Sequence, residues 1–153
     1  CMNRRGFIEK TLQMNRDHEG EELLILFADL DHLKEINDSF GHIEGDFSIR
    51  HCAEVLKKVV GADGIVGRIG GDEFCVVTLG NLKDGQQIIE RIREESDAFN
   101  CTSDKEYYVE LSAGCTSVIC RNGLVIADAL READRALYEV KKLRRNSVKK
   151  IRL

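Results

Sequence analysis

The chain has 153 residues, which suits one domain with a single hydrophobic core. Its formal net charge of −4 offers no general attraction for a nucleic acid backbone or an anionic membrane, so neither partner is expected. The longest apolar run, Leu23 to Ala28, is much shorter than a membrane span, and no apolar stretch follows residues 1–5 as a signal peptide requires.

Hydrophobic periodicity predicts an alternation of helices and strands. In chain order we expect helix 3–16, buried strand 23–28, helix 33–40, helix 49–60, a hairpin over 65–79, helix 84–99, strand 107–119, helix 126–140 and an edge strand over 149–153. This order indicates an α+β domain with helices packed on a mixed sheet, rather than a doubly wound fold.

Six cysteines are present, but their positions do not indicate a disulfide framework. Cys52, Cys75 and Cys115 fall in apolar patterns, where free cysteine behaves as a small hydrophobic residue. No Cys-x-x-Cys pair exists, and His51 lacks partners at metal-ligand spacing. We therefore expect reduced thiols in a cytoplasmic domain. This expectation also holds if the domain is part of a longer protein that is anchored in a membrane.

Carboxylates follow two of the predicted strands. Asp29 and Asp31 end the buried strand and point to one face, because they are two residues apart. Gly70-Gly71 predicts a tight hairpin turn, since both positions tolerate positive φ, and Asp72-Glu73 follow directly. Such a cluster repels itself without a cation, which favours a divalent metal site. The alternative is that these are ordinary turn residues and strand ends.

Polar residues downstream of the strand suit a bound nucleotide. Lys34 places a cation near the acids, where it could meet a phosphate oxygen. Asn37 and Asp46 flank apolar helices, and a carboxylate at such a place accepts the two adjacent N–H groups of guanine. Lys141 and Arg145 share one helix face. The alternatives are solvated helix residues, a helix cap, and cations placed favourably at a helix C-terminus.

Together these motifs resemble the GGDEF diguanylate cyclases. The runs that carry the resemblance are NRRGF (3–7), DLDHLKEIND (29–38), GHIEGD (41–46), RIGGDEF (68–74) and ADRALY (133–138), with Lys141 and Arg145-Asn146. They cover nearly the whole chain in the family's order and spacing. The resemblance implies a five-stranded, mostly antiparallel sheet flanked by helices, similar to the palm of nucleotide polymerases and cyclases.

The resemblance also implies a reaction. A homodimer with one GTP per subunit would condense two GTP molecules into cyclic di-GMP and release two pyrophosphates. By matching position, Asp29, the Leu30 carbonyl, Asp72 and Glu73 would bind Mg²⁺, with Mn²⁺ as an alternative. Asp72 would also be the base for the 3′-hydroxyl, with Glu73 assisting at the second metal, and Lys34 would stabilise the transition state.

Further residues are assigned by the resemblance to GTP itself. They are Asn37, His42, Asp46, Gly70, Gly71, Lys141 and Arg145. Asn37 and Asp46 would read guanine and His42 would line the nucleotide pocket. The two glycines would let the backbone approach the phosphates, and the two cations would hold the β and γ phosphates.

Departures from the family pattern are informative. Many members carry an Arg-x-x-Asp inhibitory product site, but the matching positions here are Gly61 and Gly64, so we expect that site to be absent. Leu33 replaces the usual aromatic residue and Arg144 the usual glycine. The family's Leu-Thr-Gly segment and any sensory domain are missing, so residues 1–153 are expected to be one catalytic domain excised from a longer multidomain signalling protein.

Two functional classes therefore remain, an active GTP-condensing enzyme and a non-catalytic GTP-binding regulatory module. The presence of every proposed metal and base residue favours the enzyme. A cyclase acting within one nucleotide fits less well, because Asp46 and several motifs match the diguanylate cyclase pattern.

Overall fold

The computed structural model describes the backbone of residues 1–152 and the side chains of residues 1–144. These residues form one antiparallel sheet of four strands in the order β2-β3-β1-β4. The strands are β1 (Glu22–Leu30), β2 (Ile65–Arg68), β3 (Glu73–Leu79) and β4 (Leu111–Ile119). The helices are α1 (Arg4–Asp17), α2 (Leu33–Phe40), α3 (His42–Val60), α4 (Leu82–Thr102) and α5 (Ile126–Arg152).

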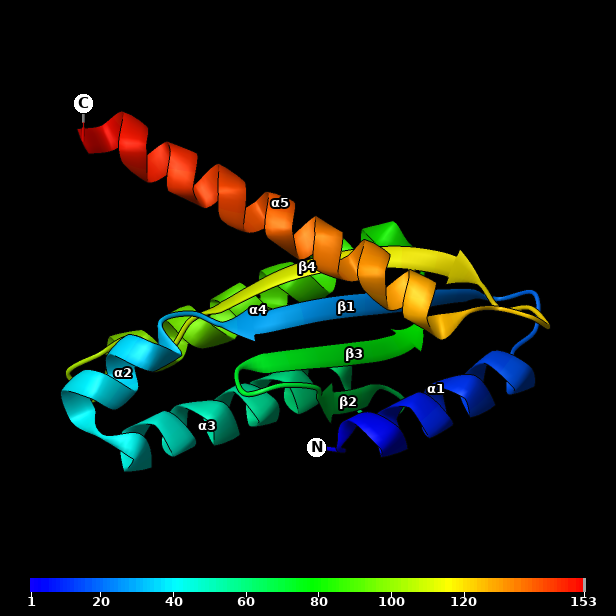
Figure 1. Ribbon diagram of the computed structural model, residues 1–153, viewed down its shortest axis with the longest axis horizontal. Helices are drawn as coiled ribbons and strands as arrows, with labels where there is room; N and C mark the ends of the chain where they lie inside the picture. Colours follow the sequence, from blue (N-terminus) through cyan, green and yellow to red (C-terminus); the bar gives the residue numbers. More distant parts are fainter. Residues whose placement is uncertain (153) are drawn as a thin grey trace.

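Side chains of β1 alternate between two layers of helices. Leu24 and Leu26 pack in a core cluster with α3 and α4, whereas Leu23 and Ile25 pack in a second cluster with α1 and α5. Figure 1 shows α5 crossing the near side of the sheet, with α4 behind it. Because strand side chains alternate with a period of two, Asp29 faces the same side as Leu23 and Ile25, toward α5.

The helix ends follow local chemistry. Asn3 caps α1, since its side chain accepts a hydrogen bond from the backbone N–H of Gly6 at 2.9 Å. Asn81 and Asp84 form a reciprocal capping box at the start of α4. Gly41, with φ of 91°, ends α2 and leads directly into α3. Over the described residues, none of these helices has the length and apolarity needed to cross a membrane.

The expected α+β architecture is confirmed, but the sheet is antiparallel rather than mixed, the helix predicted over 49–60 already begins at His42, and two strand predictions change. The fifth strand over residues 149–153 is not confirmed, because residues 149–152 continue α5 and residue 153 lies outside the described part of the chain. Lys and Arg, which make up most of this stretch, have high intrinsic helix propensity, so its sequence suits a continuation of the helix.

The strand expected to start at Tyr107 instead begins at Leu111. The backbone of Val109 is held by a side chain rather than by a neighbouring strand. The Asn100 amide donates to the Val109 carbonyl at 3.0 Å and accepts from its N–H at 2.9 Å. Such side-chain bonds compete with sheet pairing.

Candidate functional site

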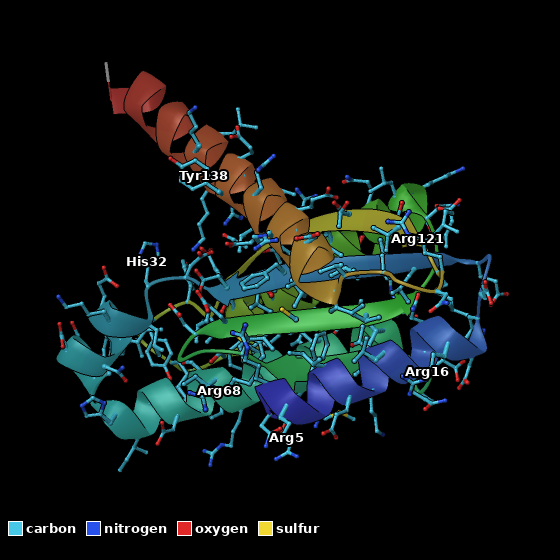
Figure 2. All side chains as sticks on the ribbon, turned by 45° about the vertical axis from the view of Figure 1, so that its right-hand side comes forward. Arg5, Arg16, His32, Arg68, Arg121 and Tyr138 are labelled. Carbon is cyan, nitrogen blue, oxygen red and sulfur yellow. The ribbon has the colours of Figure 1, made fainter. Side chains whose placement is uncertain are left out.

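The expected site residues gather at one end of the sheet. The tip of β1, the β2–β3 loop, α2 and the first turn of α3 all lie at the left-hand end in Figure 1. Figure 2 shows His32, which precedes α2, at the end of the molecule opposite Arg16 and Arg121. His32 has φ of 60°, so the chain turns from β1 into α2 through a left-handed residue that is not glycine.

The carboxylates at the tip of β1 meet cations from α5. Lys141 Nζ contacts Asp29 Oδ2 and lies 3.9 Å from Asp31 Oδ1. Arg144 Nη1 lies 3.2 Å from Asp31 Oδ2 and donates to Ser112 Oγ at 2.8 Å. Ser112 in turn donates to Asp31 Oδ2 at 2.7 Å. The two acids therefore lie under α5, as the alternation of β1 requires.

Burial perturbs the first of these acids. Desolvation raises the pKa of Asp29 to about 6, although the Lys141 ammonium opposes that rise and the Asp72 carboxyl adds to it. Because the Asp72 carboxyl contributes to the raised pKa of Asp29, the two carboxyl groups lie near each other. Their backbones are also joined, because the N–H of Leu30 donates to the Asp72 carbonyl at 2.9 Å.

Glu73 completes the acidic group from the neighbouring strand. Its Cα is directly paired with that of Asp29 in the β1–β3 register, so both side chains leave the same face of the sheet. The carboxylate of Glu73 lies over Gly70, where an added Cβ would come within 2.7 Å of Glu73 Oε2. A side chain at position 70 would therefore displace the carboxylate end of Glu73.

The Gly-Gly turn differs from the expected tight hairpin. The β2–β3 connection spans residues 69–72, and neither Gly70 nor Gly71 has positive φ. The turn is instead held by Arg68, whose guanidinium donates to the carbonyls of Gly70 at 3.2 Å and Gly71 at 2.8 Å. The sequence pattern did not identify this role of Arg68, because a side chain reaching back to turn carbonyls leaves no periodic signal.

The nucleotide-binding candidates lie on α2 and α3. Lys34, His42 and Asp46 are exposed, so they are available to a ligand. Asn37 is half-buried and packs on Gly45, where an added Cβ would lie 1.8 Å from Asn37 Oδ1. Gly45 was not among the predicted site residues. The only sequence signal for it is its place in the GHIEGD run, which does not show that Asn37 packs there.

Of the two cations expected on α5, the structure describes the side chain of one. Lys141 lies at the carboxylates, whereas the side chain of Arg145 is outside the described residues. Arg144, which departs from the family pattern, reaches the Asp31–Ser112 pair. Gly61 ends α3 with φ of 76°, and Gly64 packs against Val60, so both positions serve the turn before β2.

The residues present fit a magnesium ion that is completed by substrate. No group of three or more acidic, histidine or cysteine side chains within the described part of the chain could hold a metal by itself. However, Asp29 Oδ1 is buried without a hydrogen-bond partner there, beside the Asp72 carboxyl. Mg²⁺ is typically bound by one or two carboxylates together with substrate phosphates, so this pair of acids suits it.

Comparison with known proteins agrees with the geometry. The family described as diguanylate cyclase, GGDEF domain, matches residues 1–147. The chain belongs to the GGDEF domain family. Diguanylate cyclase DgcP of Escherichia coli (strain K12) is 37% identical over 145 residues, covering 92% of this chain and 42% of that protein. Probable diguanylate cyclase DgcT of the same strain is 31% identical over 152 residues, covering 95% of this chain and 33% of that protein.

Solved GGDEF structures share the fold. The active GGEEF domain of a diguanylate cyclase from Vibrio cholerae has a TM-score of 0.79 at 28% identity, covering 92% of this chain and 91% of that one. The GGDEF domain of DgcB from Caulobacter crescentus, in complex with c-di-GMP, has a TM-score of 0.80 at 26% identity, with coverages of 92% and 85%. This GGDEF domain therefore matches whole solved domains but spans less than half the length of the two curated relatives.

Proposed function

We propose that this GGDEF domain is the catalytic domain of a diguanylate cyclase. It condenses two GTP molecules into cyclic di-GMP as a homodimer, with one GTP per subunit and release of two pyrophosphates. The single observation that carries the proposal is the neighbouring placement of Asp29 and Asp72 at the Gly-Gly turn, where the Leu30 N–H donates to the Asp72 carbonyl and Asp29 Oδ1 is buried without a hydrogen-bond partner. This pair supplies what a triphosphate-bound divalent cation needs, on a domain whose relatives are named diguanylate cyclases.

The proposed metal site uses oxygen donors only. Asp29, the Leu30 carbonyl, Asp72 and Glu73 would hold Mg²⁺ or Mn²⁺ against the triphosphate. When bound, such an ion neutralises the charge that develops on the phosphate oxygens. The chain contributes Asp72, which accepts the proton of the 3′-hydroxyl. That oxygen attacks the α-phosphate of the other GTP while the bond to pyrophosphate breaks.

The remaining groups bind and orient GTP. Lys34 places positive charge at the reacting phosphate, and Lys141 with Arg145 holds the outer phosphates. Asp46 accepts the adjacent N–H groups of guanine, whereas adenine presents an acceptor there, so the wrong base leaves a carboxylate without its hydrogen bonds. Asn37 adds a second contact to the base and His42 lines the pocket. These groups work by positioning and electrostatics, which dominate phosphoryl transfer.

A forced dimer tests the proposal. The chain is fused to a parallel coiled coil, incubated with GTP and Mg²⁺, and its products are separated by chromatography. We expect pyrophosphate and cyclic di-GMP, and a loss of at least about 100-fold in rate for Asp72→Asn. If the fusion binds GTP yet forms no pyrophosphate over hours, the enzymatic proposal fails and a regulatory GTP-binding module remains.

A further inference from the structure

A segment that the proposed mechanism does not use contacts the nucleotide-binding helices. Residues 103–110, here named the strap, connect α4 to β4 and lie outside both elements. At its far end the strap reaches the carboxylate site, because the N–H of Asp31 donates to the Glu110 carbonyl at 2.9 Å. Between its ends the strap contacts the first turn of α3.

That contact is made through Glu44. Lys105 Nζ lies 2.9 Å and 3.2 Å from the two carboxylate oxygens of Glu44, and Tyr107 donates its hydroxyl to Glu44 Oε2. The Tyr107 ring also packs against Phe40, the last residue of α2, at 5.0 Å between centroids. Lys105 lies over the Phe47 ring at 4.5 Å. Through Lys105 and Tyr107, the strap therefore contacts both the end of α2 and the first turns of α3.

The first turn of α3, which the strap contacts, also carries Asp46, the residue proposed to bind the base. Glu44, Gly45 and Asp46 are consecutive: the first is held by the strap, the second receives the Asn37 amide, and the third is exposed for the base. The side chains of Glu44 and Lys105 are 29% and 28% exposed, and the pair is also held by the Tyr107 hydroxyl and the Phe47 ring, so its geometry is better defined than that of an isolated surface pair. Charge and hydrogen bonding lower the pKa of Glu44, with Tyr107 the larger cause and Lys105 the next.

We propose that Glu44, Lys105 and Tyr107 are positioning residues that set the guanine selectivity of this domain by fixing the first turn of α3 against the strap. The inference rests on the proposed function and extends it, since none of the three residues touches the base. Asp46 distinguishes guanine from other bases only when its carboxylate is placed to accept the N–H groups of guanine. If the first turn of α3 can shift, the carboxylate is placed less accurately and the selectivity falls. The strap also ties that turn to the tip of β1, so base reading and metal binding share one frame.

Inosine triphosphate provides the sharpest probe, because it lacks the exocyclic amino group of guanine. Steady-state kinetics of the coiled-coil fusion with GTP and ITP are compared for wild type, Glu44→Gln, Tyr107→Phe and Lys105→Met. We expect the preference for GTP over ITP to fall about five- to tenfold through the KM for GTP, while kcat changes less than about twofold. Lys105→Arg should restore most of the preference, because it keeps the charge.

Lys58→Met is the matched control. It removes a lysine from the same helix and breaks the Lys58–Glu95 pair at 2.7 Å, but that pair lies away from the first turn of α3. Its GTP-to-ITP preference should equal that of wild type. Unchanged preferences in Glu44→Gln and Tyr107→Phe would overturn the inference, as would an equal loss in Lys58→Met.

Measurements of nucleotide binding test this inference independently of the proposed enzymatic activity. Dissociation constants of GTP and ITP, measured by calorimetry on the unfused chain and its variants, report the same selectivity without turnover. A wild type that binds GTP in preference to ITP but makes no product contradicts the enzymatic proposal alone, and the variants still decide the inference. A wild type with no preference between the two nucleotides overturns the inference itself.

Discussion

Replacing Asp29 by asparagine should stabilise the metal-free protein at neutral pH. Asp29 is mostly buried, with 17% of its side chain exposed, and burial raises its pKa from 3.8 to about 6. Because one pKa unit corresponds to about 1.4 kcal/mol, ionising this group in the folded state costs at most about 3 kcal/mol. Asparagine keeps the shape and removes the charge, although Lys141 then loses its strongest partner.

The sign of the pH dependence follows from the raised pKa. Between about pH 4 and pH 6 the folded state binds more protons at Asp29 than the unfolded state does, so the stability it contributes is present below pH 4 and is lost as pH rises toward 6. Above about pH 6 both states are ionised and this contribution is flat. The difference in stability between Asp29→Asn and wild type should therefore grow over that interval and then remain constant.

Urea denaturation in EDTA at half-unit steps from pH 4 to pH 7.5 measures the effect. Asp97→Asn, an exposed site on α4, controls for loss of one carboxylate. We expect a gain for Asp29→Asn of about 1–3 kcal/mol at pH 7, near zero at pH 4, and none for the control. Adding Mg²⁺ together with GTP should stabilise wild type more than Asp29→Asn, because the nucleotide completes the metal site. Parallel pH curves for wild type and Asp29→Asn would refute the assigned burial and charge of this group.

Three further substitutions test the geometry of the site. Gly45→Ala places a Cβ where the Asn37 amide lies, so the KM for GTP in the fusion assay should rise about tenfold, with overpacking lowering stability by about 1–3 kcal/mol. Arg144→Gln removes the link to Asp31 and Ser112, and hydrogen exchange of α5 should accelerate, while urea stability changes by less than about 1 kcal/mol. Asp46→Ser should reduce the preference for GTP over ATP in competition kinetics.

Each of these tests has a contrasting result. Gly6→Ala adds a methyl to another helical glycine that has ordinary 3.4 Å contact, and it should leave the KM unchanged. A Gly45→Ala variant that behaves like Gly6→Ala would show that the Asn37 contact does not matter for binding. Unaltered exchange in Arg144→Gln would show that the contacts of Arg144 with Asp31 and Ser112 do not hold α5 on the sheet, and an unchanged GTP-to-ATP preference in Asp46→Ser would remove Asp46 from base reading.

The sequence predicted the elements that depend on strong local signals. The apolar run from Leu23 to Ala28 identified the central strand, and Asn3 and Gly41 marked helix ends that the structure confirms. Asp29 and Asp72 were expected at the same end of the sheet, and the structure places them there, because the Leu30 N–H donates to the Asp72 carbonyl. These inferences needed only periodicity, capping chemistry and the direction of the strands.

Other features depend on contacts between distant segments, which no local pattern reports. Asn100 holding Val109 shortened β4, and Arg68 rather than positive φ organises the Gly-Gly turn. Gly45 is required by Asn37, eight residues earlier on another helix. In each case the deciding interaction is a side chain that reaches a backbone group or a neighbouring helix, so tertiary structure overrides the local preference.

The register of β1 links the hydrophobic core to the chemistry. Even-numbered residues from Leu24 to Leu30 pack with α3 and α4, and odd-numbered residues pack with α1 and α5. A slip of one residue would turn Asp29 into the apolar layer under α3 and would leave Lys141 without its partner, which is costly for both charges. Because β1 is apolar on both faces from Leu23 to Ala28, the ion pair of Asp29 with Lys141 is what distinguishes the face that carries the carboxylates. The α5 cations Lys141 and Arg144 balance those carboxylates, and under the proposed function a divalent ion with a triphosphate would take over that role.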